Sequence, residues 1–185
     1  MSTNTLSRSL HDVGLAAWFG GTLANATALN PAAAQADSAR GTGAVANVGW
    51  DRWTPVNAAA IAAHVVGSVG MLGSDVGRLT VQTGAGRTAL LKTGLTVAAL
   101  GVTAYSRVLG RRVSAQTEVP AESGTEPSTG TPSDVAAAQR QLRLLQWAVP
   151  ALTGALVVVS ARAGEEQRPA NILDGITSRI PGLSG

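Results

Sequence analysis

Residues 53–74 read WTPVNAAAIAAHVVGSVGMLGS, a run of 22 residues without a charged side chain. A second charge-free run of 24 residues, VGLAAWFGGTLANATALNPAAAQA, occupies residues 13–36, and a third of 18 residues, LLQWAVPALTGALVVVSA, occupies residues 144–161. Residues 88–106 form a fourth window of 19 residues, in which Lys92 is the one charged side chain. A helix needs about 20 apolar residues, within a range of about 17–25, to cross the ~30 Å hydrocarbon layer of a membrane. All four windows meet that requirement.

The composition favours a membrane protein over a soluble one. Charged residues are 14% of the chain, against about 25% in an ordinary soluble domain. A soluble four-helix bundle keeps a polar face on each helix, whereas these windows carry apolar or small side chains on every face. The sequence therefore predicts an all-α integral membrane four-helix bundle, with residues 1–185 forming a single multi-pass domain in the cell membrane. The expected helices cover residues 13–35, 54–75, 88–107 and 135–162, the last one kinked at Pro150.

The segments between and after the windows differ in character. Residues 113–133 are rich in Ser, Thr, Pro, Glu and Gly, which predicts a flexible, solvent-exposed loop. Apolar residues at helical spacing predict a short interfacial helix over residues 171–180, and a frayed tail over 169–185 is the alternative. The sequence AAAQA at residues 32–36 resembles a signal-peptide cleavage site, and cleavage there would leave three spans.

Small residues recur every four positions along three of the windows. In lipid, small side chains let two helix backbones approach closely, so this pattern predicts a compact bundle. A genome rich in G and C encodes abundant alanine and glycine in any case, and that compositional explanation stays open. The expected helix-packing residues are Ala16, Gly20, Ala59, Ala63, Gly67, Gly94 and Ala98.

Four spans place both termini on one side of the membrane and most aromatic residues on the other. Because tryptophan and tyrosine favour the membrane–water interface, the expected interface anchors are Trp50, Trp53, Tyr105 and Trp147. Each side carries seven Lys or Arg residues, so the positive-inside rule gives no orientation. The dense group Arg107, Arg111 and Arg112 favours a cytoplasmic location for loops 37–52 and 107–143.

Several classes of function are excluded or disfavoured by residue type. The chain has no cysteine, which excludes disulfides, zinc–thiolate sites and cysteine-bound iron–sulfur clusters. It has no paired carboxylates, nucleophile elbow, metal-ligand cluster or phosphate-binding glycine loop, so we expect no enzymatic activity, catalytic residue, metal or cofactor. No Lys/Arg run exceeds Arg111-Arg112, which argues against nucleic-acid binding. No Asp or Glu lies inside a window, so a small transporter is a disfavoured alternative.

His64 is the candidate residue for a cofactor or small-molecule contact, because an ionisable group inside a membrane is costly to keep. At 1.5 Å per residue it lies ~15 Å inside the membrane, whereas His11 lies at the edge of the same side. We therefore expect that the two histidines cannot hold one haem iron between them. His64 alone is left with three alternatives: a hydrogen bond to a facing helix, a haem or small-molecule site, or a contact to another membrane protein. Lys92 is expected to extend its amine to the interface.

Four phrases of the chain resemble uncharacterised four-span membrane proteins of high-GC actinobacteria. They are HDVGLAAWFGGTLANATALN at 11–30, GWDRWTPVNAAAIAAHVVG at 49–67, TAYSRVLG at 103–110 and QRQLRLLQWAVPALTGAL at 139–156. The resemblance implies a possible accessory part of a larger assembly, such as a respiratory supercomplex, and no catalytic residue. The main prediction is a non-enzymatic accessory or scaffold subunit. Such a subunit packs its small-residue helix faces against another membrane protein or a second copy of itself.

Overall fold

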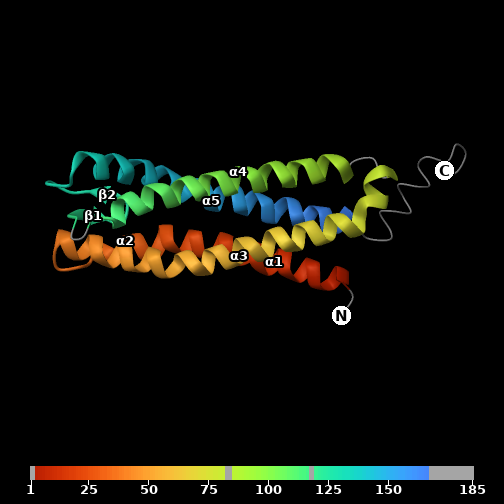
Figure 1. Cartoon of the computed structure of the whole chain (residues 1–185), viewed down its shortest axis with the longest axis horizontal. Coiled ribbons are helices and arrows are strands. Elements are labelled where there is room, and N and C mark those ends of the chain that lie inside the picture. The colour runs from red at the N-terminus through yellow and green to blue at the C-terminus, as the bar shows by residue number, and fades with distance from the viewer. Residues whose placement is uncertain (1–2, 82–84, 117–118, 167–185) are drawn as a thin grey trace, which may run out of the picture.

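The computed structural model of the chain describes residues 3–81, 85–116 and 119–166, which are almost entirely α-helical. The four long helices run antiparallel to their neighbours and pack as two pairs, α1 with α3 and α4 with α5 (Figure 1). α1 also packs on α5, whereas α3 and α4 contact each other little. The bounds of the long helices are α1 Thr3–Ala24, α3 Ala39–Val81, α4 Ala85–Ser114 and α5 Ser133–Glu166.

Three of the four long helices are apolar enough to cross a membrane. The qualifying segments are Ala39–Gly73, Gly86–Ser114 and Ser133–Glu165. α1 ends at Ala24, in the middle of the expected window 13–36, and so contains only the first half of it. The helical bundle agrees with the sequence prediction, while the fourth span and the kink at Pro150 stay predictions.

The helices extend further than the charge-free windows. α3 begins at Ala39 rather than near residue 54, and its 43 residues make it about 65 Å long. α1 begins at Thr3, ten residues before the expected start. Charged residues ended the windows, but a helix that leaves the hydrocarbon layer can continue in water, so the charges do not mark the helix ends.

The end of the first window is divided into short pieces. A π-helix, η1 (Asn25–Leu29), leads into α2 (Asn30–Ala33), with Pro31 in the first turn of α2. Proline has no N–H and clashes with the preceding helical turn. The wider π turn accommodates it, with the Asn30 N–H donating to the Asn25 carbonyl. Residues 34–38 then reverse the chain into α3.

The segment between α4 and α5 contains a short hairpin. Strands β1 (Ala121–Ser123) and β2 (Glu126–Pro127) form an antiparallel hairpin at one end of the bundle (Figure 1). Val119 and Ala121 are apolar side chains within an otherwise polar run, and both are buried. Val119 joins a core cluster with Leu109, Val113, Val135 and Ala138. The interfacial helix expected at 171–180 and the tail at 169–185 lie outside the described residues.

The middle of the bundle is held by one buried residue from each long helix. These residues are Trp18, Ala60, Ala99 and Val149. Nearby hydroxyl groups bond within their own helices: Thr22 donates to the Trp18 carbonyl and Thr153 to the Val149 carbonyl, both at 2.8 Å. Such bonds satisfy polar groups without water, which makes threonine-rich helices compatible with lipid.

Candidate binding cavity and buried histidine pair

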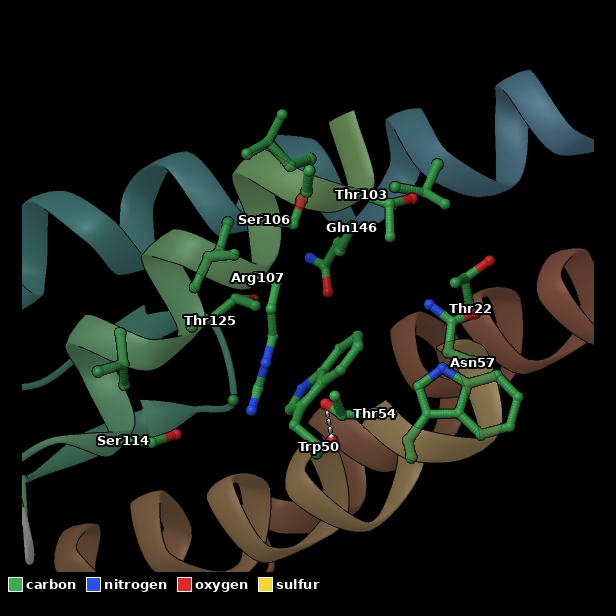
Figure 2. A pocket seen from close by; sticks show the side chains of 18 of the residues that line it. Thr22, Trp50, Thr54, Asn57, Thr103, Ser106, Arg107, Ser114, Thr125 and Gln146 are labelled. Carbon is green, nitrogen blue, oxygen red and sulfur yellow. Dashed lines mark hydrogen bonds between the residues drawn. The ribbon is translucent and has the colours of Figure 1, made fainter. Parts of the chain in front are cut away.

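A cavity of about 300 Å³ lies between the two helix pairs. α3 and α4 supply most of its walls, α5 and α1 supply the remaining helical residues, and the hairpin closes it with Gly124 and Thr125 (Figure 2). Its apolar wall includes Ile61, Leu100, Leu142, Leu145 and Val149. A cavity of this size is at the lower end of the range for small-molecule sites, which are mostly apolar with a few polar groups.

Two of the four expected interface anchors line this cavity. Trp50 and Trp53 are partly buried and lie on its α3 wall. Tyr105 and Trp147 are about half exposed on the outer surface, as interface anchors are expected to be. Sequence position gives the level of an aromatic residue along the bundle, but not whether its ring faces inward or outward.

Four buried polar atoms of the lining have no hydrogen-bond partner within the described part of the chain. They are Trp53 Nε1, Asn57 Oδ1, Thr103 Oγ1 and Arg107 Nε. A buried polar group without a partner costs about 1–3 kcal/mol. These atoms belong to side chains that line one cavity, so a molecule bound there would lie close to groups that need donors and acceptors.

Asn30 holds the walls of the cavity together. Its side chain is 2% exposed. Its Nδ2 donates to Gln146 Oε1 of α5 at 2.8 Å, and its Oδ1 accepts from Trp50 Nε1 of α3 at 2.9 Å. Sequence reasoning missed Asn30. The available signal was an amide side chain inside a charge-free window and next to a proline.

An ion pair crosses from α4 to α3 beside the cavity. Arg107 Nη1 lies 3.3 Å from Asp51 Oδ1, with side-chain exposures of 34% and 53%. Figure 2 shows the Arg107 side chain extending from α4 alongside Trp50. Two turns further along α4 and one turn back along α3, Ser114 Oγ donates to Asn47 Oδ1 at 3.4 Å. These contacts link two helices that otherwise touch little.

The two histidines lie together in the structure, so the depth argument that separated them was wrong. His11 and His64 are 1% and 0% exposed, and their ring centroids are 4.5 Å apart. His11 Nδ1 donates to Asp12 Oδ1 at 2.7 Å, and His64 Nδ1 donates to the His11 carbonyl at 3.3 Å. α1 begins ten residues before its window and α3 runs past the end of its window, so distances counted from window ends did not give the relative levels of the two histidines.

Two glycines allow this close contact between α1 and α3. A Cβ atom at Gly14 would clash with the Ala60 carbonyl oxygen and lie 2.5 Å from the His64 amide nitrogen. A Cβ atom at Gly67 would clash with the His11 amide nitrogen. The histidine pair therefore lies where the backbones of α1 and α3 approach closely.

The other expected packing residues occupy different surroundings. Ala63 is partly buried, whereas Ala59 and Ala16 are exposed. Gly20 and Gly94 have open space where a side chain would lie, and Ala98 is exposed beside Gly94 on α4. Of the seven expected packing residues, Gly67 is buried between helices, Ala63 is partly buried and the other five lie on the outer surface.

The histidine pair does not fit a haem clamped between two imidazoles. Two nitrogens that ligate one metal at about 2 Å are about 4 Å apart with the metal between them. The centroids of the two imidazole rings would then be further apart than the 4.5 Å between the rings of His11 and His64. His64 does not line the cavity. Among the described residues, no group of three or more His, Cys, Asp or Glu side chains could hold a metal ion.

Comparison with known proteins adds no name or activity. No family model, curated protein or solved structure matches the chain. The resemblance to actinobacterial four-span proteins therefore stays a prediction. A fold does not by itself imply a function, so the cavity geometry carries the functional proposal.

Proposed function

We propose that the chain is a non-enzymatic, multi-pass membrane protein whose cavity binds one amphipathic small molecule. The observation that carries this proposal is the coincidence of an apolar cavity with four unpartnered polar atoms in its lining. An amphipathic molecule supplies both the hydrocarbon for the walls and the polar groups for those atoms. This replaces His64 with the residues around Trp53 and Arg107 as the expected binding site.

The levels of the charged residues support a position near one membrane face. The 15 residues from Lys92 to Arg107 on α4 rise about 22 Å. Both side chains are long enough to extend outward from the hydrocarbon layer, so this stretch matches a layer of ~30 Å. Arg107 lines the cavity, so in this proposal the cavity lies across the boundary between headgroups and hydrocarbon.

An accessory role beside a membrane partner is a second proposal, supported by the exposure of α4. Only 6% of the apolar window of α4 is buried in the bundle, against 22% for the windows of α3 and α5. Gly94 and Ala98 lie on that uncovered surface. Lipid or a neighbouring helix would cover it.

A cavity-filling substitution tests the binding proposal. Ala104 lines the cavity and Ala98 does not, although both are exposed alanines on α4. The full chain is purified in mild detergent as Ala104→Phe and as the matched control Ala98→Phe, and bound molecules are extracted and identified by mass spectrometry. We expect one amphiphile in about equimolar amount with the unaltered protein and with the control, and a reduction of at least about fivefold with Ala104→Phe. Equal recovery from all three proteins, or recovery from none, would contradict the proposal.

A further inference from the structure

We propose that the molecule in the cavity is an anionic lipid whose phosphate or carboxylate group binds Arg107. This inference rests on the proposed binding function and names its ligand class. The lipid head would lie beside Arg107 and Trp50, and its chain would extend along the apolar wall toward Ile61 and Leu100.

The sign of the head group follows from the charge of the lining. Among the described residues that line the cavity, Arg107 is the one charged side chain. Its Nε is buried without a partner in the described part of the chain, and Nη1 contacts Asp51 only at 3.3 Å between partly exposed groups. A guanidinium has five N–H donors and matches the oxygens of phosphate and carboxylate groups. The guanidinium, as the one charged group of the described lining, therefore favours an oxyanion in the cavity.

The other unpartnered atoms indicate what lies next to the charged group. Thr103 Oγ1 is four residues from Arg107 on α4, about 6 Å along the helix. Asn57 and Trp53 are on α3, and Figure 2 shows Asn57 and Thr103 bordering the space from different helices. Trp53 Nε1 can only donate and Asn57 Oδ1 can only accept. Hydroxyl and ester groups near the head of a lipid provide both kinds of partner.

The remaining walls suit a hydrocarbon chain. Beyond the polar residues the lining consists of aliphatic side chains, including Ile61, Leu100 and Val149. The cavity volume of about 300 Å³ is small for a whole lipid, so part of the chain must lie outside it. Because α3 and α4 contact each other little, the gap between them is the route by which the chain would reach the surrounding bilayer.

Tryptophan quenching tests the head-group preference. Trp147→Phe removes the exposed indole, so quenching reports on Trp50 and Trp53 in the lining. It also reports on Trp18, which packs behind the apolar wall at Val149. The full-length protein in neutral-detergent micelles is titrated with phosphatidylglycerol or phosphatidylcholine carrying the same dibrominated chains. We expect phosphatidylglycerol to reach half-maximal quenching at a mole fraction about fivefold to tenfold lower. Titration with a dibrominated fatty acid shows whether a carboxylate head group binds as a phosphate head group does. Added inorganic phosphate shows whether the free anion competes with the lipid.

Variants assign the preference to Arg107. Arg107→Gln should abolish it, Arg107→Lys should keep part of it, and Asp51→Asn should increase it by releasing the guanidinium. Arg111→Gln is the matched control, because Arg111 is exposed on the same helix and does not line the cavity. One outcome would overturn the anionic ligand and keep the binding function. In that outcome both lipids quench equally and saturably, Ala104→Phe abolishes the quenching, and Arg107→Gln leaves it unchanged. Quenching that neither saturates nor responds to Ala104→Phe would overturn both.

Discussion

The side chain of Asn30 bonds to two residues that line the cavity. Its amide joins α2 to Gln146 of α5 and to Trp50 of α3, and it is buried. Asn30→Ala removes both bonds and leaves two partners unsatisfied, so we expect a loss of about 2 kcal/mol in the free energy of unfolding. Thermal unfolding followed by tryptophan emission in detergent measures the effect.

The matched control for this prediction is Asn25→Ala, one turn earlier. The Asn25 Nδ2 atom is buried without a partner in the described residues, so its removal should be neutral or slightly stabilising. Equal losses from both variants would mean that the Asn30 bonds add nothing beyond the general cost of altering this turn.

At the level of single residues, the sequence identified chemical types but not their neighbours. His64 was recognised as costly to bury, and its partner His11 was placed at the wrong depth. Trp50 and Trp53 were expected to face the headgroups, and they line a cavity instead. Which way a side chain points depends on the rotation of each helix about its own axis, and near-uniform apolar windows do not encode that rotation.

The contact between α1 and α3 gives a prediction at the level of helix packing. A Cβ atom at Gly14 would clash with the backbone of α3, whereas one at Gly20 on the same helix would meet open space. Backbone cannot move aside as a flexible side chain can, so we expect Gly14→Val to cost about 3 kcal/mol or more, and Gly14→Ala somewhat less. Gly20→Val should be close to neutral. Helix content, thermal unfolding and yield of monodisperse protein are compared for the three variants.

An opposite ranking would show that α1 packs through its Gly20 face. In that case a partner or a second copy would be the natural occupant of the Gly14 side. The two outcomes are separable even if Gly14→Val fails to fold, because Gly14→Ala introduces a single methyl group at the same position.

The four long helices were predictable in number and order. Four charge-free windows correspond to the four long helices, because both follow from the need to bury or shield apolar side chains. Their ends were not predictable, since charges end a window without ending a helix. The burial of Val119 depends on residues of α4 and α5 that pack around it, and the charge-free window gives no sign of the π turn before Pro31. Composition alone therefore suggested a plain helix and an open loop.

For the whole molecule, the register of the helices determines which part of the outer surface would face lipid. The apolar windows of α1 and α3 are offset along the bundle: Gly21, early in the first window, lies against Trp53 at the start of the second. The belt shared by all helices is therefore shorter than any single window, and it is bounded by Lys92 on one side and Arg107 on the other. Outward extension of these side chains is what would adapt the bundle to a bilayer.

The number of crossings is decided by whether α1 passes through the membrane. The chain contains no cysteine, so single cysteines report their own position without interference. Leu6 and Ser38 are both exposed and lie near opposite ends of the α1–η1–α2 segment. In sealed vesicles we expect a membrane-impermeant maleimide to label either Leu6→Cys or Ser38→Cys, but not both, until detergent opens the vesicles. Thr129→Cys, two residues after β2, should follow Ser38→Cys. Val97→Cys, which is exposed within the apolar belt, should react slowly throughout. Labelling of Leu6→Cys and Ser38→Cys from the same side would mean that α1 does not cross. Monodisperse protein in buffer without detergent would mean that no helix does, since the exposed valines and leucines of α4 would then be stable in water.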